Sequence, residues 1–405
     1  MRVVISHESF EVFGGTETYM FTVAQHLDWL GHETLIYAQR IGPIAEFARN
    51  HGVRATASAV ELPPSCDAVL AQDAGSALEL AGRYPSAVSV FVAHSRGYAA
   101  QIPPQLEGVC QAIVVLNDRV RRFIEQLPFH PQIVRLRQPI DLQRFGSFGL
   151  YPPQPRRALV IGNYMHGAQA QLLEEACRAA GMDVSFLGAH ARVSATPEHA
   201  IADADVVIGL GRCILEAMAS RRAAYVYGVG GADGWVTPAR YAALEADGFS
   251  GQVGGTPLDR DALASDLHDW DVGMGHSNRA LAAAHHGATK HAMALVELMR
   301  DHGAPDRKPL SHAQELARLV RLEWRVRARF AGAVEENTAL RERAEKAELE
   351  AAQARASAEA HLRELSLANQ RLQDLRATRR YRFACRLAAP LDALRSRFGA
   401  GRDQS

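Results

Sequence analysis

The stretch DADVVIGLGRCILEAMASRRAAYVYG, residues 203–228, gives the clearest indication of the fold. Its apolar run at 206–208 predicts a strand that is buried on both faces, and the run at 223–227 predicts a second strand of the same kind. Between the two runs, Gly209 and Gly211 predict a turn, after which a helical pattern begins. A strand, a turn, a helix and a second strand form a β-α-β unit, which is typical of a parallel sheet.

The same alternation of strands and helices extends over most of the chain. Five strand-like runs lie within residues 2–134: VVIS, TLIYA, DAVLA, SVFVA and AIVVL. A second series begins with ALVIG at 158–162 and ends with one long helix that we predict at 277–302. Two such series predict an α/β fold with two doubly wound, Rossmann-like domains, whose ligand cleft lies between the carboxyl ends of their strands.

Changes in composition along the 405 residues mark the domain boundaries. A proline-containing linker follows the first series, and from residue 311 onward Glu, Arg, Ala and Leu dominate. This last part shares no pattern with the α/β part, so we expect it to be dispensable for folding. We place a first Rossmann-like domain, a linker, a second Rossmann-like domain, a coiled coil and a basic tail at 1–140, 141–157, 158–303, 311–378 and 379–405.

The segment at 311–378 contains a heptad pattern. Steps of three and four residues from Phe330 to Leu375 meet alanine or leucine at most positions, which is typical of a coiled coil. Because most of these residues are alanine, each layer would bury little area, and Asn337 at a core position would fix the register. A single solvated helix is the alternative.

The end of the chain is strongly basic. Residues 376–402 contain eight arginines and one aspartate. Apolar residues that include Phe383 and Leu387 can share one side of a helix, and basic amphipathic helices bind anionic lipid. A helix docked on a partner protein and a solvated chain end are the two alternatives.

Charge and cysteine content exclude several classes of protein. Lys+Arg and Asp+Glu both number 45, so no net field favours nucleic acid as a partner. The five cysteines form no C-x-x-C pair, which argues against a zinc or iron–sulfur site and suits a reducing cytoplasm. The first apolar run is too short for a signal peptide, and no stretch is long enough to span a bilayer. We expect a cytoplasmic protein whose membrane contact is peripheral.

Two turns in the first series are candidates for ligand contact. In SFEVFGGTETYM, Gly14 and Gly15 allow the backbone to approach a phosphate at the start of a helix, although such pairs also occur in ordinary tight turns. This is not the G-x-G-x-x-G fingerprint, so NAD is not indicated. In VFVAHSRGY, His94 follows a strand and can reach a substrate hydroxyl; a histidine satisfied by neighbouring loops is the alternative.

A third candidate turn lies within residues 203–228. The backbone N–H groups from Gly211 to Cys213 begin a helix, which predicts an anion site to which Arg212 adds charge. Glu216, about one turn further along, can accept hydrogen bonds from sugar hydroxyls. A diphosphate at the helix end and a ribose on the carboxylate would together make a nucleotide-sugar site. The alternative is that Glu216 caps the helix or pairs locally.

Three segments resemble motifs of the GT-B glycosyltransferases, and family 4 of that group is the most similar. GGTETYMFTVAQHLDWLGHETLIYA at 14–38 resembles that family's Gly-Gly-x-Glu start, and QPIDLQRF at 138–145 resembles the segment that enters the linker. RCILEAMASRRAAYVY at 212–227 resembles the Glu-Ala-Met-Ala donor helix, which is the most specific of the three. The resemblance covers about residues 1–303.

The resemblance implies roles for the residues of the three turns. His94 would contact the transferred sugar and Glu216 would hold the ribose, so these two are the catalytic candidates. The donor-binding candidates are Gly14, Gly15, Asn163, Gly211, Arg212, Cys213 and Glu216. Such enzymes retain the sugar's configuration and need neither metal nor cofactor, because helix dipoles and basic side chains neutralise the leaving diphosphate.

The sequence departs from the family pattern at two places. The family has a glutamate eight residues before Glu216, where this chain has Ile208. It also has an arginine and a lysine after the first strand of the second domain, where VIGNYMHGAQAQ contains neither. The segment GGADGWVTPARY at 230–241 is either a ligand-facing loop that rebuilds the sugar end of the site or a structural hairpin.

The sequence therefore predicts a glycosyltransferase that moves a sugar from a nucleotide-sugar donor to a glycan or lipid-linked acceptor in cell-surface polysaccharide synthesis. The basic tail would hold the enzyme at the inner face of the cell membrane, and the coiled coil would mediate self-association. The alternative is a catalytically inactive GT-B-like scaffold or binding protein in a glycan-assembly complex, which Ile208 and the missing basic pair favour.

Overall fold

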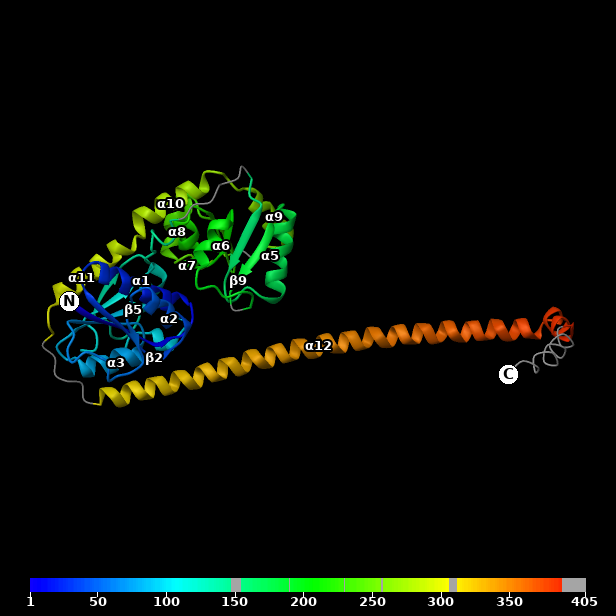
Figure 1. Ribbon diagram of the computed structural model, residues 1–405, viewed down its shortest axis with the longest axis horizontal. Coiled ribbons are helices and arrows are strands. Elements are labelled where there is room, and N and C mark those ends of the chain that lie inside the picture. Colours follow the sequence, from blue (N-terminus) through cyan, green and yellow to red (C-terminus); the bar gives the residue numbers. More distant parts are fainter. Residues whose placement is uncertain (147–153, 189, 229, 256–257, 306–311, 388–405) are drawn as a thin grey trace, which may run out of the picture. The chain divides into compact units, whose positions relative to one another are not determined.

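The computed structural model describes residues 1–146, 154–188, 190–228, 230–255, 258–305 and 312–387. Internal contacts divide the chain into two units, Met1–Arg325 and Val326–Ser405. The first unit contains two sheets with their helices, and we call these the first half (β1–β7) and the second half (β8–β12). The second unit contains most of one long helix (Figure 1).

The first half is built on a seven-stranded parallel sheet with the order β3-β2-β1-β4-β5-β6-β7. Its strands are β1 (Arg2–Phe10), β2 (Glu33–Ile41), β3 (Ala55–Thr56), β4 (Ala68–Ala71), β5 (Val88–Ala93), β6 (Ala112–Val115) and β7 (Gln132–Arg135). The five predicted runs form β1, β2, β4, β5 and β6. The sequence pattern misses β3, which has two residues, and β7, which is only partly buried.

Helices connect the strands of the first half. They are α1 (Gly15–Trp29), α2 (Pro43–Asn50), α3 (Ala74–Arg83) and α4 (Asp118–Ile124), and a 3-10 turn, η1 (Ala99–Gln101), follows β5. Asp73 caps α3 by accepting a hydrogen bond from the Ser76 N–H, as Asn117 does for α4. No side chain caps α1, which begins at the glycine pair.

The second half has a five-stranded sheet with the order β12-β11-β10-β8-β9. Its strands are β8 (Arg157–Ile161), β9 (Asp183–Leu187), β10 (Val206–Gly209), β11 (Ala223–Gly228) and β12 (Gly231–Trp235). Its helices are α5 (Gly167–Ala179), α6 (Pro197–Asp203), α7 (Arg212–Ala219), α8 (Pro238–Ala246) and α9 (Arg260–His268). The quoted stretch forms β10, α7 and β11, as predicted.

The segment at 230–241 contains a hairpin strand. β12 pairs antiparallel with β11, whereas the other strands of this sheet are parallel. The buried Asp233 carboxylate accepts hydrogen bonds from the backbone N–H groups of Val253, Gly254 and Gly255. These contacts favour the structural hairpin over the ligand-facing loop.

The prediction of one helix at 277–302 is wrong, because two helices occupy this region. They are α10 (Met274–His285) and α11 (Ala288–His302), separated by Gly287 in an extended conformation. Ile140 inserts at the break: its N–H donates to the His286 carbonyl, and its carbonyl accepts from the Ala288 N–H. The two segments that connect the halves, around Ile140 and around Gly287, thus lie side by side.

The two helices on either side of this break pack on different halves. α10 lies against α7 of the second half, whereas α11 lies beside α1 of the first half (Figure 1). Five apolar residues of α11 join the core around β1: Ala292, Leu295, Val296, Leu298 and Met299. The last helix of the region that we assigned to the second domain therefore contributes to the core of the first half.

The long helix, α12 (Ala313–Ala377), begins within the first unit. Ala313, Ala317 and Arg321 are buried there, so the beginning of the segment that we expected to be dispensable for folding packs on the first unit. Residues 379–387 of the basic tail are helical and exposed, and residues 388–405 lie outside the described residues. Within the described ranges, no helix is long and apolar enough to cross a membrane.

Candidate functional site

A cavity of about 430 Å³ lies between the two halves of the first unit. Its volume is within the range of small-molecule sites. The first half contributes Phe13, Gly14, Gly15, Thr18 and Tyr98. The other side includes Arg144, Asn163, Tyr164, Arg212, Cys213 and Glu216. Six of the eight predicted site residues are thus brought together, and the exceptions are His94 and Gly211.

The glycine pair at the start of α1 forms one wall of the cavity. A Cβ on Gly14 would lie 2.4 Å from Oε2 of the buried Glu17, so a side chain here would force that carboxylate to move. A Cβ on Gly15 would have no atom within 4 Å. Gly14 therefore packs against a protein neighbour, whereas Gly15 is the position at which a ligand can approach the backbone.

Glu216 lines the cavity and also pairs locally. Its Oε1 lies 3.1 Å from Nε of Arg212, four residues earlier on α7, and both side chains are about nine-tenths buried. Burial raises the pKa of Glu216, and the Arg212 charge opposes that shift. The structure therefore agrees with the alternative that Glu216 pairs locally, and this pair lies in the lining of the cavity.

Arg212 connects the second half to two other parts of the unit. Its Nη1 donates to the carbonyl of Pro139 at 3.2 Å, and its Nη2 donates to the Thr22 hydroxyl of α1 at 3.1 Å. Burial lowers the pKa of Arg212, and the Glu216 charge partly restores it. This guanidinium is held rigidly between the halves, at the wall of the cavity.

The turn before α7 only partly fulfils the prediction of an anion site. The Gly211 N–H donates to the Phe249 carbonyl at 2.8 Å, and Gly211 does not line the cavity. Its φ of +65° explains the glycine. The Cys213 thiol lines the cavity but donates to the Leu210 carbonyl at 3.2 Å. The expectation that the Gly211 N–H binds a phosphate is therefore wrong, because a protein carbonyl already accepts it.

His94 lies beside the cavity and does not line it. Its Nε2 hydrogen-bonds to the side-chain oxygen of Gln72, and its ring packs edge-on against Tyr19 with 4.9 Å between the centroids. Burial lowers its pKa to about 3, so the imidazole is neutral at physiological pH. These contacts agree with the alternative of a histidine satisfied by its neighbours.

Arg144 is a site residue that the sequence analysis missed. It lines the cavity, and its guanidinium lies over the rings of Phe47 and Phe145 at 5.1 and 5.3 Å. Its Nη2 donates to Glu198 at 2.9 Å. The signal was present, because Arg144 belongs to the quoted segment QPIDLQRF. The cavity therefore contains a second guanidinium beside Arg212.

The two departures from the family pattern have different consequences. Ile208 is fully buried in the core of the second half and does not line the cavity, so no polar group is supplied from that position. Asn163 and Tyr164 line the wall where the family has basic residues. The arginines that line this cavity are Arg144 and Arg212, and each pairs with a carboxylate, Glu198 and Glu216 respectively.

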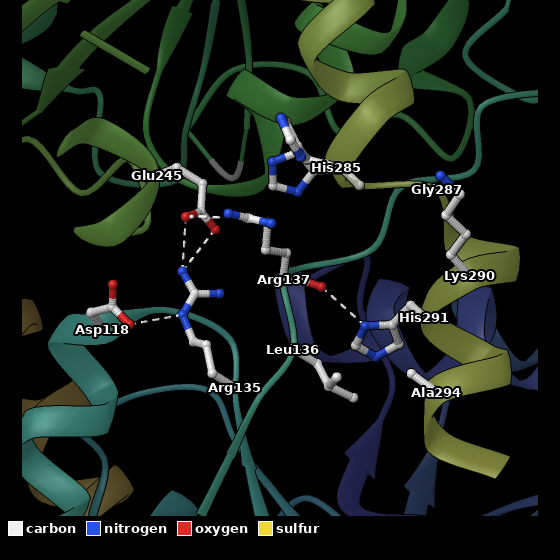
Figure 2. A pocket seen from close by; sticks show the side chains of 11 residues that line it. Asp118, Arg135, Leu136, Arg137, Glu245, His285, Gly287, Lys290, His291 and Ala294 are labelled. Carbon is white, nitrogen blue, oxygen red and sulfur yellow. Dashed lines mark hydrogen bonds and ion pairs between the residues drawn. The ribbon is translucent and has the colours of Figure 1, made fainter. Parts of the chain in front are cut away.

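A second cavity, of about 380 Å³, lies on another part of the boundary between the halves (Figure 2). Arg135 of β7 donates to both carboxylate oxygens of Glu245 at 2.8 Å and to Asp118 at 3.0 Å. Arg137 lies 3.5 Å from the same Glu245. Arg135 belongs to β7 of the first half and Glu245 to α8 of the second half, so this ion pair joins the two halves.

Among the described residues, no group of three or more His, Cys, Asp or Glu side chains is arranged to hold a metal ion. The first cavity is lined by two arginines, Arg144 and Arg212. Guanidinium groups bind phosphate oxygens with a planar, two-pronged geometry.

Comparison with known proteins gives the fold. No family model and no curated protein matches the sequence. The structure of HepE from Anabaena in complex with UDP and glucose is similar with a TM-score of 0.54 and 12% identity over 74% of this chain and 100% of that one. AviGT4, a glycosyltransferase involved in avilamycin A biosynthesis, has a TM-score of 0.46 at 13% identity over 74% and 97% of the two chains. MurG from Acinetobacter baumannii has a TM-score of 0.42 at 13% identity over 73% and 99%.

The similarity to HepE covers about three quarters of this chain and the whole of the HepE chain. The predicted α/β fold with two Rossmann-like halves is confirmed, and a long carboxyl-terminal helix follows it. The chain has the GT-B fold.

Proposed function

We propose that the protein is a glycosyltransferase that moves a sugar from a nucleotide-sugar donor to a glycan or lipid-linked acceptor. The observation that carries the proposal is the cavity between the halves, where Gly15, Arg144, Arg212 and Glu216 meet. This set combines an open backbone position, two cations and a carboxylate, which suits a ligand with a diphosphate and a ribose. The HepE structure, which contains UDP and glucose, has the same fold.

Each side chain of this set has a defined task in the proposed reaction. When the bond between the sugar and the diphosphate breaks, negative charge develops on the leaving oxygen, and Arg144 and Arg212 would stabilise it. Because Glu216 is oriented by Arg212, it is prepared to accept hydrogen bonds from the ribose hydroxyls. Assignment to family 4, retention of configuration and independence from metal rest on the sequence motifs and belong to this proposal.

The inactive scaffold is the second candidate. It is favoured by Ile208, whose position supplies no polar contact to a donor sugar, and by the local pairing of Glu216. It is opposed by Arg144, which brings a second cation to the cavity. A protein of this kind would bind a nucleotide and transfer nothing.

We also propose a place in the cell and a mode of assembly. The long helix beyond Arg325 exposes a row of apolar residues that includes Phe330, Leu340, Leu365 and Leu372, which suits pairing with a second copy. The arginine-rich end suits a cytoplasmic enzyme that contacts the inner face of the cell membrane, where lipid-linked acceptors for cell-surface polysaccharides are found.

A screen followed by an assay tests the proposed function. The purified full-length chain is heated with a panel of nucleotide sugars, and a ligand is recognised by a rise in melting temperature. Each nucleotide sugar that stabilises the protein is then assayed for slow hydrolysis in the absence of acceptor, which releases the nucleoside diphosphate. Stabilisation with release supports the enzyme, whereas stabilisation without release supports the binding protein. A panel without a single stabilising nucleotide would contradict both candidates.

A further inference from the structure

The beginning of α12 docks on α3 through a pair of glycines. We call residues 313–325 the docked segment. Gly75 and Gly82 are seven residues apart on α3 and so share one face of that helix. A Cβ on Gly82 would lie 2.7 Å from Cβ of Ala313, and a Cβ on Gly75 would lie 3.0 Å from Cγ of Arg321. The two segments lie side by side in Figure 1.

The glycine pair indicates a close contact that the sequence encodes. Glycine inside a helix costs about 1 kcal/mol relative to alanine, so two on one face need a compensating interaction. Ala313 and Ala317 are small residues four apart on α12 and both are buried. Small residues on both helices allow the backbones to approach, which brings Arg321 to the end of β1.

Arg321 is buried between acidic side chains of the first half. Its Nε donates to Oε2 of Glu8 at 3.0 Å, and its Nη2 donates to Glu79 of α3. Glu8 is 1% exposed and Arg321 is 8% exposed. A buried carboxylate that loses its cation keeps its desolvation penalty, so the pair is held together strongly.

The same Glu8 continues a row of ion pairs toward the cavity. Its Oε1 accepts from Nη1 of Arg40 at 3.1 Å, and Nε of Arg40 donates to Oε2 of Glu11 at 2.7 Å. Glu11 also accepts from the Ser9 hydroxyl. Glu11 lies in the connection between β1 and α1, two residues before Phe13 and three before Gly14, which both line the cavity.

A second contact joins the docked segment to the end of β1. The ring of Trp324 packs edge-on against the buried His7, with 5.8 Å between the ring centroids. His7 and Glu8 are neighbours on the strand that leads into the cavity wall. Two residues of α12 therefore hold the last part of β1.

We propose that Arg321 is a positioning residue for the cavity, acting through Glu8, Arg40 and Glu11 on the connection between β1 and α1. The docked segment of α12 would then help to position the connection between β1 and α1, which lines the ligand site. The identity of the ligand rests on the proposed function, whereas the effect on the connection does not.

The test compares three variants of the full-length chain. Arg321→Met keeps the aliphatic stem and removes the charge. Arg40→Met breaks the middle of the row at a half-exposed side chain and leaves the docked segment untouched. Arg318→Met is the matched control, because Arg318 lies about one turn earlier on α12 and its ion pair in the described part of the chain is with the exposed Glu315.

Amide hydrogen exchange of residues 9–17 is the first measurement. We expect exchange to become about two- to thirtyfold faster in Arg321→Met and in Arg40→Met, and to be unchanged in Arg318→Met. Arg321→Lys should restore part of the protection, because an ammonium can pair with Glu8 but cannot form the fork. If Arg321→Met does not fold, the Arg40→Met result decides. Wild-type exchange in Arg40→Met would overturn the proposal.

The dissociation constant for UDP is the second measurement. If the wild type binds UDP, Arg321→Met and Arg40→Met should bind it about two- to thirtyfold more weakly than Arg318→Met does. Equal affinity in all three would overturn the positioning role. A wild type that does not bind UDP would count against this nucleotide in the proposed function, and the exchange measurement would still decide the inference.

Discussion

Glu216 lies in the wall of the cavity, and its carboxylate pairs with Arg212. Its place in the cavity follows from the Gly-rich turn and the helix pattern. Its partner could also have been predicted, because Arg212 is four residues earlier, where helix side chains meet. The part played by Arg144 does not follow from helix or strand spacing, because a crossing segment outside both sheets brings it to the cavity, and its place in QPIDLQRF was the one signal in the sequence.

The two glycines at the start of α1 give a residue-scale prediction. Gly14→Ala should lower the free energy of unfolding by about 1–3 kcal/mol, because its Cβ would press on the buried Glu17 carboxylate. Gly15→Ala should change it by less than about 0.5 kcal/mol, because its Cβ meets no atom. Urea denaturation of both variants checks this. Equal losses of stability would contradict the prediction that a Cβ at position 14, unlike one at position 15, presses on Glu17.

At the scale of elements, the sequence predicts long apolar patterns better than their interruptions. The five buried runs of the first half form strands at the expected places. The break between α10 and α11 was not predictable, because Gly287 alone resembles any helical glycine. The reason for the break is Ile140, which is far away in sequence and pairs with the backbone at 286 and 288.

Two histidines beside this break give an element-scale prediction on pH. His286 and His291 donate through Nδ1 to the carbonyls of Gln138 and Arg137, and their Nε2 atoms accept from Tyr241 and Tyr19. Burial lowers the pKa of each to about 4. The unfolded chain takes up these protons near pH 6.5, the folded chain only near pH 4. Stability should therefore be complete above pH 6.5 and fall between pH 6.5 and 4, by about 1.4 kcal/mol per pH unit for each histidine.

Urea unfolding at pH 7.5 and at pH 5.0 measures this dependence. Buried carboxylates with raised pKa values, such as Glu8 and Glu17, act in the opposite direction, so a variant is needed to isolate the histidines. His291→Gln should be less stable at pH 7.5 and should lose less stability on acidification than the wild type. The same loss in both proteins would assign the acid sensitivity to other groups.

The basic tail gives a second prediction at this scale. Arginines 379, 380 and 382 lie in the helical part that the structure describes, and each could add about 1 kcal/mol on an anionic surface. The full-length chain should co-sediment with anionic vesicles and hardly with neutral ones. Replacing the three arginines by serine should remove most of this binding. Equal sedimentation of the two proteins would leave partner docking or a solvated end as the role of the tail.

At the scale of the whole molecule, the boundary between the two compact units of the chain lies after Arg325, whereas the composition changes at residue 311. Three residues of the docked segment that follows this change, Ala313, Ala317 and Arg321, are buried, and two of them contact the glycines of α3. This boundary could not be predicted from the sequence, because alanines in a coiled-coil seam and alanines packed against glycines have the same spacing. The contacts of Arg321 with Glu8 and Glu79 make the first turns of α12 part of the first half.

Two truncations test this boundary. Residues 1–325 should form a stable monomer by light scattering, and the full chain should be oligomeric if α12 forms a coiled coil. Residues 1–305 should be less stable by about 3 kcal/mol or more, because Glu8 and Glu79 lose a buried cation. Equal melting temperatures of the two truncations would refute the docking of α12, and a monomeric full chain would refute the coiled coil.

The proposed function requires the cavity between the halves to bind a nucleotide sugar through Arg144, Arg212 and Glu216. This binding is measured by titration calorimetry with UDP on the wild type and on Glu216→Gln. Loss of a charge-assisted hydrogen bond should weaken binding by about 1–3 kcal/mol, and the buried pair with Arg212 means that some stability is lost as well. The wild type should bind UDP, and the folded variant should have a dissociation constant about five- to 150-fold higher. The absence of a binding heat in the wild type would count against UDP as the nucleotide, and equal affinity in the two proteins would contradict the role of Glu216 in the site.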